Sequence, residues 1–124
     1  MNRRSFLTLS ATGLALLPAT RLIAGGHGRL GSFTGSSGHT TTGTAEIADG
    51  KVNLLADFTF DGAPDPKVAL GRDGYDPNTL MGLLTSNSGA SSYTIPAGID
   101  ASQYNEVWIW CEQYNVPLGV AKLN

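Results

Sequence analysis

Turn-forming residues recur about every ten residues along this chain, and they limit its fold more than any other feature. Asp49-Gly50 is the strongest of these signals, because a two-residue type I′ hairpin turn needs a positive φ at both central positions. Two prolines interrupt 61–66, and further turn residues fill 87–89 and 96–98. The segments between these turns have the length of β-strands and are too short for ordinary helices.

Most of the segments between the turns are rich in apolar and β-branched residues, which are enriched in strands. The predicted strands cover 40–48, 51–60, 67–70, 80–85, 91–95, 106–111 and 116–123. The segment 80–85 also fits one helical turn. About seven short strands without long helices predict an all-β single domain, either a β-sandwich or a small barrel.

The first 24 residues have the pattern of an export signal. Arg3 and Arg4 form a basic start, an apolar stretch follows over 6–17, and Pro18-Ala19 ends it. The segment Asn2–Leu7 resembles the twin-arginine export motif. A general secretory signal and a short core helix are the alternatives. The pattern predicts a signal peptide over 1–24 and a periplasmic or secreted protein.

The segment that follows the signal, 25–38, is rich in Gly and Ser and has little periodicity. We predict that it forms a flexible lead-in and that the ordered domain spans 39–124.

The charge of the exported chain limits its partners. Without residues 1–24, five basic residues face ten acidic ones, which gives a net charge of −5. This balance disfavours nucleic acid and anionic membrane surfaces. No apolar run reaches the ~20 residues that a membrane-spanning helix needs.

Cys111 is the only cysteine, so an internal disulfide is impossible. The thiol must be buried, bound to a cofactor, redox-active or paired with another chain. On a strand over 106–111, Cys111 shares a face with Val107 and Ile109, while Trp108 and Trp110 take the other face. Both faces are apolar, which fits a buried core thiol. The position at the strand end also fits a redox or cofactor-binding thiol, since thiolate is a haem ligand.

Three other residues are candidates for the same site. His39, at the start of a predicted strand, could bond a backbone group at a strand edge, or it could be a second ligand or proton partner for Cys111. Trp108 and Trp110 could line a ligand surface together with Tyr104 and Tyr114, or these rings could pack between sheets.

The Asp-rich loops offer calcium as a rival cofactor. Asp73–Asn78 could supply oxygen ligands, but its spacing matches no EF-hand loop. Ordinary turn chemistry, in which Asp and Asn cap their own backbone, accounts for the same residues. We therefore expect no metal site.

Several short motifs together resemble the electron-transfer DM-thirteen domain, a small extracellular module often found beside DOMON domains. They are His39–Thr44, Asp57-Phe58, Pro64-Asp65, Asn87–Gly89, Tyr93–Pro96, Val107–Cys111 with its Trp-x-x-Cys, and Leu118–Leu123. The resemblance runs from about His39 to Leu123, and the order and spacing of the motifs carry it.

The resemblance implies a β-sandwich-like module with a redox or electron-transfer role centred on Cys111. The cysteine would act as a bare thiol or as a ligand to a prosthetic group such as haem. Such a module exchanges electrons with a redox or cell-envelope protein and is not a catalyst with its own substrate. The alternative is a cofactor-free binding or structural module of the cell envelope, in which Cys111 only fills the core.

Overall fold

The computed structural model describes residues 28–124, so the predicted signal peptide over 1–24 lies outside the described residues. The strands and the two 3-10 turns are β1 (Arg29–Gly35), β2 (Thr41–Thr42), β3 (Thr44–Ala48), β4 (Lys51–Leu54), β5 (Thr59–Phe60), β6 (Pro66–Gly71), β7 (Tyr75–Asp76), η4 (Pro77–Thr79), β8 (Ser91–Thr94), η5 (Ala101–Gln103), β9 (Glu106–Cys111) and β10 (Val116–Lys122).

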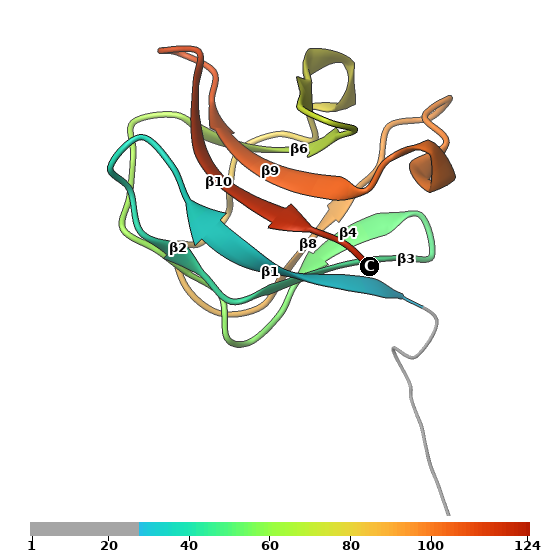
Figure 1. The fold of residues 1–124 in the computed structure, drawn as a ribbon, viewed down its shortest axis with the longest axis horizontal. Coiled ribbons are helices and arrows are strands. Elements are labelled where there is room, and N and C mark those ends of the chain that lie inside the picture. Colours follow the sequence, from blue (N-terminus) through green and yellow to red (C-terminus); the bar gives the residue numbers. More distant parts are fainter. Residues whose placement is uncertain (1–27) are drawn as a thin grey trace, which may run out of the picture.

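The main sheet has eight strands in the order β7-β6-β9-β10-β1-β3-β4-β8, and all neighbouring strands are antiparallel. The sheet curls around one core as a half-barrel (Figure 1). The short pair β2 and β5 forms a second sheet beside β1. The prediction of a single all-β domain is confirmed, in the form of a curled sheet.

The prediction of a flexible lead-in over 25–38 is wrong for β1, and the domain begins before His39. β1 lies in the middle of the sheet, between β10 and β3. Its glycines serve close packing, because a Cβ at Gly31 would overlap the carbonyl oxygen of Lys122, and one at Gly35 would overlap that of His39. A Gly-rich sequence therefore forms a central strand of this sheet.

Two other local predictions had different outcomes. The Asp49-Gly50 turn joins β3 to β4, with φ of 53° and 73°, so the predicted hairpin is confirmed. The predicted strand over 80–85 is not a regular element. The segment runs beside β6 through backbone bonds from Met81 and Leu84, but Gly82 has a φ of 101°, which an extended strand does not adopt.

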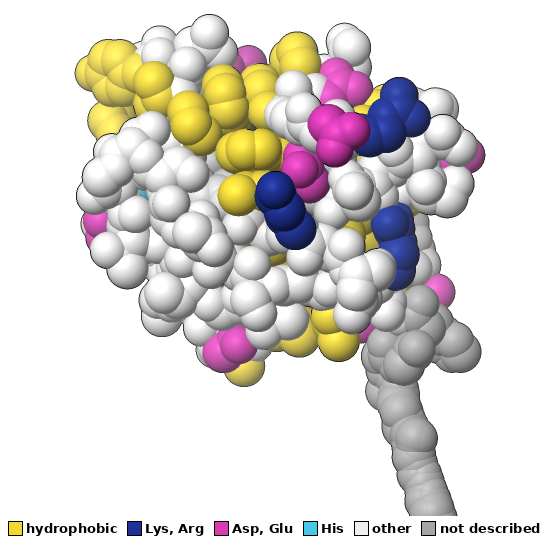
Figure 2. Space-filling view, viewed as in Figure 1, with side chains coloured by type: hydrophobic (Ala, Val, Ile, Leu, Met, Phe, Trp, Pro, Cys, Tyr) yellow, Lys and Arg dark blue, Asp and Glu magenta, His cyan; other side chains and the backbone are white. Residues whose placement is uncertain are grey.

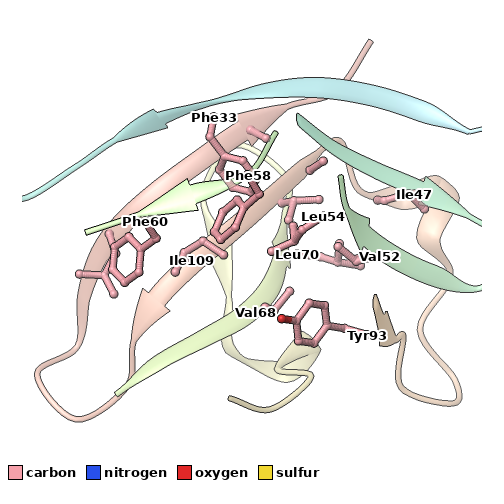
Figure 3. Packing of buried hydrophobic residues seen from close by; sticks show 14 of the residues in the cluster. Phe33, Ile47, Val52, Leu54, Phe58, Phe60, Val68, Leu70, Tyr93 and Ile109 are labelled. Atoms are coloured by element: carbon pink, nitrogen blue, oxygen red, sulfur yellow. The ribbon is translucent and has the colours of Figure 1, made fainter. Parts of the chain in front are cut away.

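The inner face of the curled sheet holds the hydrophobic core (Figure 3). Phe33 of β1 meets Phe58 edge to face, with ring centroids 5.4 Å apart. The buried side chains on both sides of this pair include Leu54, Leu70 and Ile109, all almost fully buried. The core thus spans the whole sheet and fixes the orientation of β9.

Candidate functional site

β9 carries the candidate residues on two opposite faces. Val107, Ile109 and Cys111 point into the core, and each is at most 1% exposed. Trp108 and Trp110 point away from it and are half-buried. The predicted assignment of faces is confirmed, because alternate residues of a strand point to opposite sides.

Cys111 lies at the end of β9, where the chain turns into β10. It pairs with Val116 of β10 on one side and with Pro66 of β6 on the other. The turn over 112–115 is fastened by Asp65, whose carboxylate accepts the Gln113 N–H at 2.9 Å. The thiol is therefore free of disulfides and buried, and it lies directly before an anchored turn.

Lys67, which follows Pro66 on β6, forms ion pairs with two carboxylates. Lys67 bonds Glu112 and lies 3.4 Å from Asp65. The hydrogen bond that Lys67 donates to Glu112 raises the pKa of the lysine. Lys67 pairs with Trp110 in the sheet, so it belongs to the outer face and not to the face of Cys111.

The outer face carries a set of side chains that we call the aromatic strip. Its members are Tyr75, Trp108, Trp110, Pro117 and Val120 on the strands, together with the exposed Tyr114 in the turn between β9 and β10. Tyr75 stacks on Trp110 with centroids 3.9 Å apart and planes 10° from parallel, and Trp108 meets Trp110 edge to face at 6.0 Å. Hydrophobic side chains form a continuous band over β10 and the β9–β10 end (Figure 2).

Hydrogen bonds hold the two indoles of the strip in place. Trp108 Nε1 donates to Glu106 Oε1 at 3.0 Å, and Trp110 Nε1 donates to Asn115 Oδ1 at 3.3 Å. Glu106 is only 5% exposed and also accepts the Gly74 N–H. The rings are thus oriented by specific partners, unlike side chains that only fill space.

His39 lies away from this strip and interacts with Asp61. Its Nδ1 is 2.9 Å from Asp61 Oδ1, and its ring lies 5.6 Å from that of Phe60. The Thr40 N–H and His39 lower the pKa of the Asp61 carboxyl. Within the part of the chain that the structure describes, no hydrogen bond joins His39 to Cys111. The His39 ring therefore contacts a carboxylate, which is neither the backbone group nor the thiol that the sequence analysis considered.

Aspartates of the Asp-rich loops accept hydrogen bonds from backbone N–H groups. The carboxylates of Asp57, Asp61 and Asp76 accept backbone N–H groups of Thr44, Thr40 and Asn78. Over 28–124, no group of three or more His, Cys, Asp and Glu side chains is placed to hold a metal ion.

The sequence analysis missed Tyr75 and the contact that Tyr104 makes. Asp73-Gly74 has a positive φ at both residues and joins β6 to β7, so the signal that predicted the first hairpin was present here as well. Tyr104 donates to Asp76 Oδ2 at 2.7 Å and helps to line a cavity of about 290 Å³ between Arg72 and Pro77. No local pattern indicates either contact.

We tested whether the surroundings of Cys111 fit a haem. A sulfur ligand must face a space as large as the macrocycle, whereas Cys111 packs with Ile109 and Leu118 in the closed core. The cavity noted above is lined by 72–77 and Tyr104, on another part of the fold. His39 is engaged by Asp61. The residues around the thiol do not fit a haem in this packing.

Comparison with known proteins gives one match. The profile described as "Electron transfer DM13" matches residues 32–123, a range that includes Cys111 and the whole of β9 and β10. No curated protein and no solved structure matches the chain. No helix among the described residues is long and apolar enough to cross a membrane. Since the profile covers most of the chain, this protein belongs to the DM13 electron-transfer family.

Proposed function

We propose that this protein is an exported electron-transfer module in which Cys111 is the redox-active group. The observation that carries the proposal is the match to an electron-transfer family across 32–123, which includes the only cysteine of the chain. The module works with a redox protein of the cell envelope and has no substrate of its own.

The N-terminal sequence and the charge support the exported location. Arg3 and Arg4 precede an apolar stretch, as in twin-arginine signals, and the chain without residues 1–24 has a net charge of −5. An oxidising compartment supplies disulfides as reaction partners for a single thiol. The protein would therefore act in the periplasm or outside the cell.

The chemistry that a single thiol can perform there is thiol–disulfide exchange. The Cys111 thiolate attacks one sulfur of a partner disulfide, whose S–S bond breaks as the new bond forms. The released partner sulfur leaves as a thiolate and takes up the proton that Cys111 gave to solvent. One thiolate of a dithiol protein then attacks the Cys111 sulfur and releases the second partner thiolate, and the other thiolate of the dithiol closes its own disulfide and releases Cys111. Two electrons thus pass from the dithiol to the partner disulfide, and Cys111 is regenerated as a thiolate.

The burial of Cys111 defines how this exchange proceeds. A thiol that is 1% exposed reacts only when the structure around it opens locally. The segment that would open is the adjoining turn over 112–115, which Asp65 anchors at the end of the sheet. Local opening of this turn exposes Cys111 without unfolding the core around Phe58.

The same burial favours a second candidate function. A thiol packed beside Ile109 and Leu118 fits a cofactor-free binding or structural module of the cell envelope. In that case Cys111 contributes packing alone, since free cysteine is among the most buried residue types.

The two candidates differ in the reactivity of the folded protein. We would expose the protein exported by its native host to oxidised glutathione and follow the mixed disulfide by mass. The proposal expects modification of Cys111 in urea far too dilute to unfold the domain, and none in Cys111→Ser. Modification that tracks global unfolding supports the binding module. Val107→Ala is the matched control, because it loosens the same face and keeps the thiol.

A UV–visible spectrum tests the cofactor. The proposal expects no absorption above the aromatic band in oxidised or dithionite-reduced protein. A Soret band that shifts on reduction and disappears in Cys111→Ser would contradict the bare-thiol mechanism and assign a haem to this cysteine.

A further inference from the structure

The aromatic strip ends at the most exposed aromatic side chain among the described residues. Tyr114 lies in the turn that follows Cys111 and is 61% exposed. Pro117 and Val120 on β10 lie opposite Trp110 and Trp108 in the sheet. Figure 2 shows a band of hydrophobic side chains over this part of the molecule. Large contiguous apolar patches on monomeric proteins mark sites of interaction.

The composition of the strip is that of an interface. Trp and Tyr are enriched where binding energy concentrates, and they present a large rigid area at a small entropic cost. The indoles are held by Glu106 and Asn115, so their positions are set before a partner arrives. A surface organised in this way loses little conformational entropy on binding.

Charged groups surround the strip with an excess of carboxylates. Asp65 and Glu112 lie at one end and both bond Lys67. At the other end lie the carboxylates of Asp73 and Asp76, with the cations Arg72 and Lys122. Four carboxylates against three cations leave a net charge of −1 around the strip, and residues 25–124 as a whole carry a net charge of −5. The complementary surface is apolar at its centre and basic at its rim.

We propose that the aromatic strip is the docking surface for a redox partner protein that carries an apolar contact ringed by lysines and arginines. The inference rests on the proposed function. It places the partner over the turn that follows Cys111, and Trp110 is bonded directly to Cys111 along the chain. Docking and opening of the thiol would then occur at the same end of the sheet.

Two other occupants fit the strip less well. A sugar needs the flat face of an aromatic ring, and Tyr75 already covers one face of Trp110 at 3.9 Å. A second copy of this chain would bring the same acidic rim against Asp65 and Glu112, and like charges facing one another across an interface are costly. A basic protein partner meets neither obstacle.

The probe for this proposal is cytochrome c, a basic electron-transfer protein with lysines around its exposed haem edge. We would titrate it into the ¹⁵N-labelled exported protein at low ionic strength and map the shifted amides. The expected result is saturable shifts centred on Trp108, Trp110 and Tyr114, which weaken as salt is added. Cytochrome c with acetylated lysines keeps the fold of the probe and should shift these amides at least tenfold more weakly.

Variants locate the contact within the protein. Tyr114→Ala should weaken binding about fivefold or more, as for a residue near the centre of an interface. Leu30→Ala is the control, because Leu30 is 41% exposed but lies beside the last residue of the chain, at the far end of β10. Its binding should equal that of the parent.

Several outcomes would overturn the proposal. They are shifts centred on another surface, no saturable binding, equal binding of the acetylated probe, and shifts on the strip with a neutral oligosaccharide alone. Failure here is separable from failure of the proposed function. Cys111→Ser should bind cytochrome c as the parent does while losing exchange with glutathione, because the strip contacts the partner and the thiol does not.

Discussion

On the inner face of β9, Val107, Ile109 and Cys111 are almost completely excluded from solvent, whereas Trp108 and Trp110 on the outer face keep part of each ring exposed. The inner side chains interact through close packing, which is non-directional. The outer rings interact through stacking and through hydrogen bonds to Glu106 and Asn115. The inner face therefore determines stability, and the outer face is free to determine recognition.

The largest difference between the faces should appear on removal of side-chain volume. Ile109→Ala should lower the free energy of unfolding by about 3 kcal/mol, because the closed core cannot fill the space left. Val120→Ala on the outer face should cost less than about 1 kcal/mol. Urea unfolding of both variants measures the difference. Equal losses would contradict the assignment of two distinct faces.

Polarity at the thiol position should have the next largest effect. Cys111→Ser places a hydroxyl among apolar side chains and should cost about 2 kcal/mol. Cys111→Ala removes the sulfur without adding a polar group and should cost less than the serine variant. Thermal and urea unfolding compare the two. A serine variant as stable as the parent would place position 111 in contact with water.

The stacked pair on the outer face should show a smaller, mutual effect. A double-mutant cycle on Tyr75 and Trp110 should give a coupling energy of about 1 kcal/mol, because the rings are nearly parallel at 3.9 Å. The same cycle on Tyr114 and Trp110 serves as control, since no ring contact between these two is present in the structure. Zero coupling for the stacked pair would mean that the rings separate in solution.

The smallest effect should come from the bond between Tyr104 and Asp76 near the strip. Tyr104 and the Asn78 N–H lower the pKa of Asp76, and Asp76 raises the pKa of Tyr104. The bond therefore stabilises the fold between the two ordinary pKa values, about 4 and about 10. Its contribution is lost as pH falls through the lowered pKa of Asp76 or rises through the raised pKa of Tyr104.

Tyr104→Phe tests this window. The variant should be slightly less stable than the parent at pH 6, and the difference should vanish as pH falls below about 4. Tyr114→Phe is the matched control, because its hydroxyl is on an exposed ring. A difference between Tyr104→Phe and the parent that is constant down to pH 2 would show that the carboxylate is not involved.

The parts of the fold that the sequence predicted depend on local rules. The Asp49-Gly50 turn follows from the φ values that only a few residues adopt readily, and the two faces of β9 follow from the alternation of a strand. The strand prediction for 80–85 failed because Gly82 has a φ outside the extended region, although the segment still forms backbone hydrogen bonds with β6. Local residue propensities contain no information about a contact with a distant strand, so they do not predict how such a contact and an interrupting glycine combine.

For the candidate site, too, the sequence predicted local features and not contacts between distant segments. Cys111 was identified as the only cysteine, and its face was predicted correctly from the strand period. His39 was predicted as a strand-edge residue or as a partner of the thiol, and only the fold brings it to Asp61 instead. Tyr75 was missed, because its contact with Trp110 joins segments 35 residues apart in the sequence.

The sequence by itself determined the all-β class, the first hairpin, the single thiol and the acidic charge of residues 25–124, because each depends on residue type or on neighbours a few positions away. The tertiary structure decided that the Gly-rich segment of β1 is a central strand, that Cys111 is closed off from solvent, and that Tyr75 completes the aromatic strip. These outcomes depend on which strands become neighbours, and that choice is made by burial of the whole core.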